Sequence, residues 1–135
     1  MKIYKRKIEI KTSSRVEFID ITKRVLDIVK DSKISEGICY IFVPHTTAAV
    51  TINENADRDV IRDIISTLNN LIPQEGNFRH MEGNSDAHIK SSLIGISVEV
   101  SVAGGILELG TWQGIFFCEF DGPRNREIWI KVLGE

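Results

Sequence analysis

The chain has 135 residues, a length that fits one domain with a single hydrophobic core. Hydrophobic residues make up 42% of it and charged residues 27%, which is typical of a globular protein and excludes a disordered or fibrous one. A net charge of −2 argues against nucleic acid as a partner, and no apolar run approaches the roughly 20 residues that a membrane span needs. We therefore expect neither nucleic acid nor membrane as a partner.

The N-terminal segment and the cysteines indicate the compartment. Residues 1–7 are basic but lack the apolar stretch and cleavage site of a signal peptide. Cys39 and Cys118 are the only cysteines, and each lies inside an apolar run. We expect a cytoplasmic protein with two buried reduced thiols, and a disulfide is the alternative.

The first part of the chain predicts two strands around a helix. Hydrophobic alternation in residues 7–11 predicts an amphipathic strand, and apolar residues at helical spacing in residues 21–29 predict a helix. The run 38–43 is β-branched, aromatic and apolar on both faces, which is typical of a central strand buried on both sides. Strand character resumes at residues 49–52.

The middle of the chain carries the clearest helix, from about Ala56 to Leu71. Apolar residues recur there at helical spacing, Asn53 or Asn55 is available as its cap, and Pro73 stops it. The polar loop 74–84 is long enough to suggest a functional role.

The last part of the chain predicts a short helix followed by strands. The helix starts at Ser85 or Asp86, runs to Leu93 and is ended by Gly95. The strands are predicted at residues 96–102, 106–107, 115–120 and 126–133. With helices in the middle and strands at both ends, the chain is expected to form an α+β fold with a largely antiparallel sheet or sandwich.

The three histidines are the main functional candidates. His45, His80 and His88 are the only ones, and each lies at the edge of a predicted element in polar company. Three imidazoles are the protein ligands of a catalytic type of zinc site, which leaves a position for water or substrate. The alternative is that they act as caps, loop hydrogen-bonders or solvated side chains.

Two carboxylates are candidates for supporting such a site. Glu119 interrupts an apolar strand, and a buried carboxylate needs a cation, a donor or a metal close by. It would either orient a histidine or form a salt bridge with an arginine such as Arg124. Glu54 is a candidate general base, or it simply serves the first turn of the long helix.

Hydroxyl and cationic side chains close to the histidines are candidates for anion binding. Thr46 and Thr47 follow His45, and Lys90 and Ser91 follow His88. Arg124 follows a Gly-Pro turn, where an arginine either binds an anion or is solvated. These residues predict a phosphorylated small molecule as the ligand.

Three segments carry a resemblance to a known family. They are residues 45–49 with Asn53 and Glu54, residues 80–92 with His80 and His88, and the Gly-Thr-Trp-Gln-Gly-Ile segment 110–115. Together they resemble the YjbQ-like family, whose members are often labelled secondary thiamine-phosphate synthase-like. The resemblance implies an α+β fold with a β-sandwich, a homotrimer, and a divalent metal, with zinc expected, at the positions of His45, His80 and His88.

Three functions remain open at this point. The first is an enzyme that forms thiamine phosphate, in which the metal stabilises departing pyrophosphate. The second is a metal-dependent hydrolase that uses a metal-activated hydroxide. The third is a non-catalytic trimeric metal-binding protein.

Overall fold

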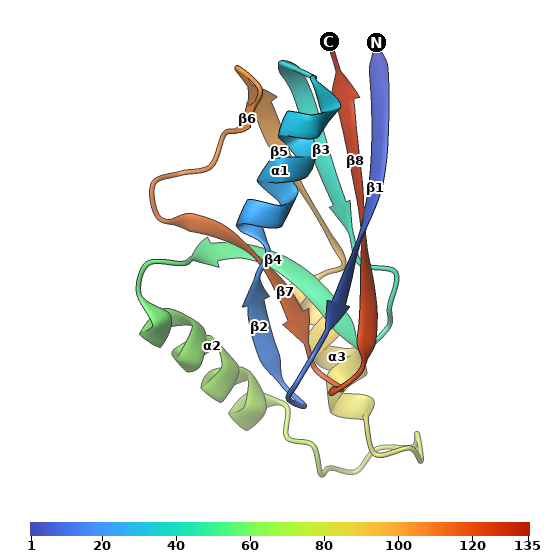
Figure 1. Ribbon diagram of the computed structural model, residues 1–135. Helices are drawn as coiled ribbons and strands as arrows, with labels where there is room; N and C mark the ends of the chain where they lie inside the picture. Colours follow the sequence, from blue (N-terminus) through green and yellow to red (C-terminus); the bar gives the residue numbers. More distant parts are fainter.

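The computed structural model describes residues 1–135 and has three helices and eight strands in two antiparallel sheets (Figure 1). The elements are β1 (Lys2–Lys11), β2 (Glu17–Asp20), α1 (Thr22–Ser32), β3 (Glu36–Phe42), β4 (Ala48–Glu54), α2 (Arg58–Leu71), α3 (Ser85–Ile94), β5 (Ser97–Ala103), β6 (Ile106–Leu107), β7 (Gln113–Glu119) and β8 (Asn125–Gly134). The predicted α+β fold with mostly antiparallel sheets is confirmed.

The two sheets share one hydrophobic core. The larger has the order β1-β8-β3-β5-β6, and the smaller has the order β2-β7-β4. Their facing sides and α1 contribute to a cluster of 19 buried residues. Alternate residues of a strand point to opposite faces, so Ile41 and Ile130 are buried in this cluster while their neighbours point outward.

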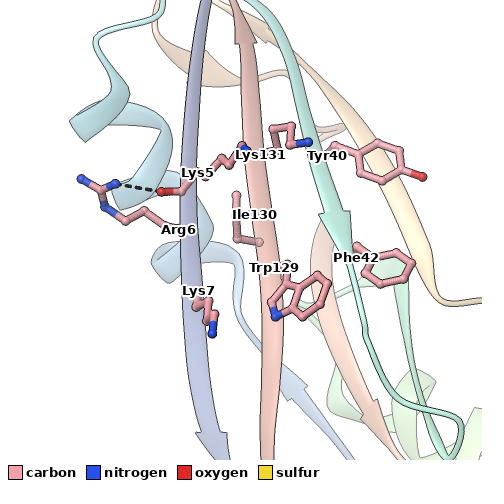
Figure 2. Close-up of a pocket in the computed structure, with 8 residues that line it drawn as sticks. All are labelled: Lys5, Arg6, Lys7, Tyr40, Phe42, Trp129, Ile130 and Lys131. Carbon is pink, nitrogen blue, oxygen red and sulfur yellow. Dashed lines mark hydrogen bonds between the residues drawn. The ribbon is translucent and has the colours of Figure 1, made fainter.

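The outer face of the larger sheet is uncovered, which corrects one prediction. β3 is a central strand between β8 and β5, as expected. It is not buried on both sides, because no layer of this chain covers its outer face, and Ile38 and Tyr40 are 46% and 39% exposed. Figure 2 shows Tyr40, Phe42 and Trp129 on this face.

The remaining helices lie at the side of the smaller sheet. α3 packs against β4, and Gly95 ends it in a positive-φ conformation as predicted. α2 has an apolar face but no fully buried residue, and its Ile61 and Leu68 pack against a small buried cluster that includes Phe116 and Phe120. Its cap is Asp57, whose side chain accepts the Asp59 N–H at 2.9 Å, rather than the predicted Asn53 or Asn55.

Both cysteines are buried and unpaired, as expected. Burial raises the pKa of the Cys39 thiol to about 12, and it raises the pKa of Cys118 as well. Thiols with raised pKa values are protonated at neutral pH, so both cysteines are buried as neutral thiols. None of the helices has the length and apolar character that crossing a membrane requires.

Candidate functional site

His45 lies in the connection between β3 and β4 and lines a surface pocket. The His45 pocket is lined by Phe42, Val43, Pro44, His45, Thr46, Thr47, Ile96, Arg124 and Arg126. His45 Nε2 accepts the backbone N–H of Glu127 at 3.0 Å, which fixes the ring against β8. Burial and the positive charge of Arg126 lower the pKa of His45, so the imidazole is neutral at pH 7.

This hydrogen bond assigns the tautomer of His45. A neutral imidazole carries one proton, and the nitrogen that accepts an N–H cannot be the one that holds it. The proton of His45 is therefore on Nδ1, which makes this side chain a hydrogen-bond donor to a ligand. A metal-bound histidine usually donates its second N–H to an acceptor, so the contact with Glu127 suits anion binding better than metal binding.

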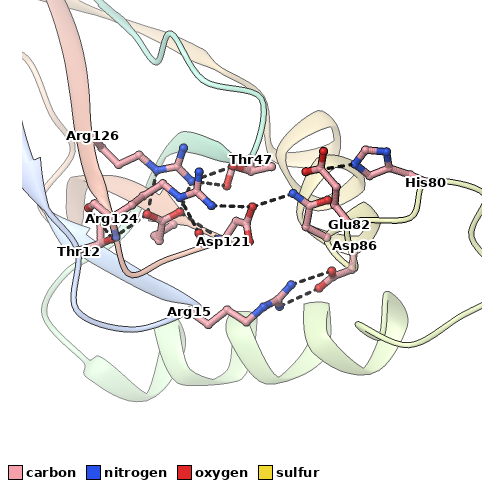
Figure 3. Close-up of polar contacts among 11 residues, drawn as sticks. Thr12, Arg15, Thr47, His80, Glu82, Asp86, Asp121, Arg124 and Arg126 are labelled. Carbon is pink, nitrogen blue, oxygen red and sulfur yellow. Dashed lines mark hydrogen bonds and ion pairs between the residues drawn. The ribbon is translucent and has the colours of Figure 1, made fainter.

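A buried ion pair supports the floor of the His45 pocket (Figure 3). The Arg126 side chain bonds both carboxylate oxygens of Glu119, and the two residues are 4% and 0% exposed. Arg126 Nη2 also donates to Thr47 Oγ1 at 2.9 Å, while Thr12 Oγ1 donates to Glu119 at 2.8 Å. Burial alone would raise the pKa of Glu119, but the hydrogen bonds from Arg126 and Thr12 outweigh it and the pKa is lowered.

These contacts separate the roles of the two arginines. The predicted partner of Glu119 was Arg124, but the structure gives that place to Arg126. Arg124 is exposed, bonds Asp121 at 3.1 Å and lines the His45 pocket, where it is available to an anion. Glu119 is fully paired inside the protein, so it supports the pocket and does not face a ligand.

His80 and His88 form a second feature, on the loop after α2 and on α3. Their ring centroids are 5.5 Å apart with the planes nearly perpendicular. The His80–His88 pocket is lined by Phe78, Arg79, His80, Ser85, His88 and Ile89. Glu82 Oε2 lies 3.8 Å from His80 Nε2, which is longer than a hydrogen bond.

The three histidines are not gathered within one chain. The His45 pocket and the His80–His88 pocket share no lining residue. No group of three or more histidine, cysteine, aspartate or glutamate side chains is arranged to hold a metal ion. Within one copy of the chain, His80 and His88 lie together and His45 lines a separate pocket.

Two of the predicted anion ligands are inside the protein. Lys90 is 1% exposed, and its ammonium bonds Asp86 at 3.1 Å and Asn69 at 2.7 Å. Arg15 donates two bonds to the same Asp86 carboxylate (Figure 3). Ser91 is 2% exposed and its hydroxyl has no partner. Lys90 therefore anchors α3 and is not free to bind a ligand.

Of the other predicted residues, Thr46 is exposed in the His45 pocket, and Thr47 is buried beneath it and bonds Arg126. Glu54 lies in a different pocket with Asp20 and Asp57, and its carboxylate accepts the Asp57 N–H at 3.2 Å. It serves the start of α2, which was the alternative considered for it. It has no contact with any histidine pocket.

Two residues have structural roles that were not predicted. Arg126 is the buried partner of Glu119, and the signal for such a partner was the lone carboxylate of Glu119 in the apolar run 115–120. Arg15 lies in a turn-rich segment, and nothing in its sequence context indicates that it reaches Asp86 on α3.

The buried carboxylates predict a loss of stability in acid. Hydrogen bonds from the basic groups overcome the effect of burial and lower the pKa values of Asp86 and Glu119 in the folded state. The unfolded chain then binds more protons near pH 4, so this stabilisation is complete above the unfolded pKa values and is lost as pH falls through the folded ones. Urea unfolding should give a free energy that declines from pH 6 to pH 3. In Glu119→Gln the free energy of unfolding should decline less over this pH range. An equal decline in the variant and the unchanged protein would contradict a lowered pKa for Glu119.

The two antiparallel sheets around one core define a small α+β protein. Its surface has a candidate anion site with a neutral imidazole and arginines, and a separate histidine pair that is a candidate metal site. Residues 6–135 match the model of the family described as UPF0047 protein YjbQ-like, and the chain belongs to this family.

Relatives cover almost the whole chain. The UPF0047 protein of Methanocaldococcus jannaschii is 56% identical over 96% of this chain and 94% of its own length. The protein YugU of Bacillus subtilis is 52% identical over 94% of this chain and 97% of its own length.

Solved structures agree with the fold. A YjbQ/UPF0047 family protein of Clostridium acetobutylicum superposes with a TM-score of 0.94 at 51% identity, over 95% of this chain and 99% of that one. A protein of unknown function from Sulfolobus solfataricus gives a TM-score of 0.96 at 38% identity, over 99% of both chains.

Proposed function

We propose that this protein is a metal-dependent enzyme that acts on a phosphorylated small molecule and is assembled as a homotrimer. The observation that carries the proposal is the pair of imidazoles, His80 and His88, whose ring centroids are 5.5 Å apart beside a surface pocket. A second pocket with two arginines and a neutral His45 supplies the groups for an anion.

The donor set of the histidine pair fits a divalent metal. Imidazole nitrogen is a common ligand of zinc, and two histidines with open positions leave room for substrate oxygens. His80 and His88 would hold the ion. The metal would supply charge stabilisation for a phosphate or pyrophosphate oxygen.

The His45 pocket fits the phosphate of the ligand. His45 Nδ1 and the exposed Arg124 guanidinium are donors, and the hydroxyl of Thr46 is beside them. The lowered pKa of His45 keeps the ring neutral, so it binds the anion by donating a proton in a hydrogen bond rather than by charge. Arg126 lines the same pocket, and its positive charge is paired with the buried Glu119 carboxylate.

Transfer of a pyrimidine group from its pyrophosphate to a thiazole phosphate, as in thiamine-phosphate formation, is the reaction we propose first. The leaving group of this reaction is pyrophosphate, which the donors of the His45 pocket and a metal at the His80–His88 pocket would both bind. Phosphate release without a coupled product would favour hydrolysis instead, and tight metal binding without turnover would favour the non-catalytic alternative.

Zinc binding tests the proposal. After equilibration with zinc and dialysis, elemental analysis should find about one zinc per chain, in keeping with a site that has protein imidazole ligands. His88→Ala should reduce it to background, and Lys30→Ala, an exposed change on α1, should leave it unaltered. Zinc retained by His88→Ala at the level of the unchanged protein would refute the metal assignment.

A further inference from the structure

Arg124 is bound along one edge of its guanidinium by a residue of its own turn (Figure 3). Its Nε donates to the Asp121 backbone carbonyl at 2.8 Å, and its Nη2 donates to Asp121 Oδ2 at 3.1 Å. A guanidinium edge with two parallel N–H groups is also what binds two oxygens of a phosphate. Asp121 therefore occupies donors that a phosphate in the His45 pocket would use, although Asp121 does not line that pocket.

The backbone around this pair is fixed, so a change of partner involves side chains only. The Asp121 N–H donates to Glu119 Oε2 at 3.1 Å. The Arg124 N–H donates to Thr12 Oγ1 at 2.9 Å, and the Arg124 carbonyl accepts the Thr12 N–H at 2.9 Å. The Arg124 side chain is 49% exposed and that of Asp121 15%. The arginine can therefore turn toward a ligand while the carboxylate stays in place.

Asp121 has a second donor, which comes from a distant part of the chain. Asn84 Nδ2 donates to the same oxygen, Asp121 Oδ2, at 2.9 Å. Asn84 directly precedes α3, where asparagine usually caps a helix, but its side chain makes no capping bond. The other amide atom, Asn84 Oδ1, is buried and has no hydrogen-bond partner. The amide is thus held at Asp121 in spite of an unpaired oxygen, which indicates a role at that carboxylate.

We propose that a phosphate group bound in the His45 pocket takes Arg124 away from Asp121, and that Asn84 holds the carboxylate that is released. Asp121 is then an internal competitor of the ligand, and Asn84 determines how readily Asp121 gives up the arginine. This inference rests on the proposed function, because it requires that the His45 pocket binds an anion. Asp121 and Asn84 act through Arg124, so both are positioning residues.

Charge sets the direction of the exchange. The ion pair between Arg124 and Asp121 has an exposed partner, and such pairs are weak. Pyrophosphate carries more than one negative charge at pH 7 and a carboxylate carries one, so pyrophosphate attracts the guanidinium more strongly. Arg124 therefore leaves Asp121 when the pocket is filled and returns to it when the pocket is empty.

The hydrogen bond from Asn84 becomes stronger during this exchange. In the free protein, Asp121 Oδ2 accepts from Arg124 and Asn84 at once, and the guanidinium offsets its charge. Once Arg124 has left, Asn84 is the remaining side-chain donor to an ionised carboxylate, and hydrogen bonds to ionised groups are stronger than neutral ones. Removal of Asn84 should therefore destabilise the ligand-bound state more than the free state.

Substitution of the two positioning residues should change the affinity for pyrophosphate in opposite directions. The full chain, freed of metal by dialysis against a chelator, is titrated with inorganic pyrophosphate in a calorimeter. Asp121→Asn should lower the Kd about three- to fivefold, because it removes the competing charge and keeps an acceptor for Arg124. Asn84→Ala should raise the Kd about two- to threefold, because the released carboxylate loses its donor.

Two further variants separate this exchange from a change in net charge or in folding. Asp27→Asn removes a carboxylate from an exposed ion pair on α1, outside the pocket, and should leave the Kd unaltered. In the double variant, Asn84→Ala should have no further effect, because Asp121→Asn leaves no carboxylate to hold. A structural role for Asn84 would instead weaken binding equally in both backgrounds. Asn84→Ala removes no helix cap, and circular dichroism checks that all variants are folded.

Failure of the inference and failure of the proposed function give different results. Opposite shifts in the two single variants, with no effect of Asn84→Ala in the double variant, would support the exchange. If the unchanged protein binds pyrophosphate but either single variant does not shift the Kd in its stated direction, the exchange is refuted and the proposed anion site stands. Equal weakening by Asn84→Ala in both backgrounds would also refute it. If neither the unchanged protein nor Asp121→Asn binds pyrophosphate, the anion site itself is refuted, and the exchange with it.

Discussion

Arg126→Met is expected to lower the free energy of unfolding by about 3–5 kcal/mol. The substitution removes the cation from Glu119, which is 0% exposed. A carboxylate left without a cation in the interior loses the interaction that offset its desolvation, and the remaining donors, the Thr12 hydroxyl and the Asp121 backbone N–H, are uncharged. Urea unfolding at pH 7 and fixed protein concentration measures the change.

Arg124→Met is the matched control for this variant. Arg124 is two residues away and also pairs with a carboxylate, but its side chain is 49% exposed. Its loss should change stability by less than about 1 kcal/mol. Equal stability of Arg126→Met and Arg124→Met would contradict the claim that the buried ion pair stabilises the fold more than the exposed one. Arg126→Met combined with Glu119→Leu should recover part of the loss, because no charge is then left buried.

Asp86→Ala is expected to lower the free energy of unfolding by a similar amount, about 3–5 kcal/mol. Asp86 is 0% exposed and accepts bonds from Arg15 and Lys90 together. Arg15 is partly exposed and can turn to water, whereas the Lys90 ammonium keeps only Asn69. Thermal or urea unfolding should show the loss.

Two comparisons establish whether the buried lysine is the cause. Asp86→Ala with Lys90→Met should be more stable than Asp86→Ala alone, because the unpaired ammonium is removed and the packing volume is kept. Asp27→Ala, which breaks the exposed pair with Lys23 on α1, should change stability by no more than about 0.5 kcal/mol. A double variant less stable than the single one would point to packing rather than charge.

The elements of the fold were predictable where hydrophobic periodicity is clear. The helix ending near Leu71, the hairpin at Gly104-Gly105 and the strand from Ile115 to Phe120 follow from spacing of 3.6 or 2 residues and from turn residues. Which strands pair is a long-range property, and the pairing of the first strand with the last could not be deduced from local pattern.

The uncovered face of β3 could not be predicted for a related reason. Ile38, Tyr40 and Phe42 alternate with Cys39 and Ile41, so every position of the strand is apolar. Such a run is expected to be buried on both sides by the same chain. A sequence does not distinguish a face covered by the chain itself from one that a second copy would cover.

The site was predictable by residue type but not by geometry. His80 and His88 do lie together, whereas the ring of His45, the third predicted ligand, bonds the final strand. Lys90 was a predicted ligand because it follows His88, yet the helical spacing of four residues brings it to Asp86 in the interior. Proximity along the chain says little about which side of a helix faces a pocket.

A crystal structure of the protein with zinc and pyrophosphate tests the account most directly. Anomalous scattering at the zinc edge should place one ion about 2.0–2.1 Å from nitrogens of His80 and His88, the usual zinc–imidazole distance. The pyrophosphate should lie in the His45 pocket, within hydrogen-bond distance of His45 and Arg124. Zinc bound elsewhere, or pyrophosphate bound outside the His45 pocket, would contradict the account.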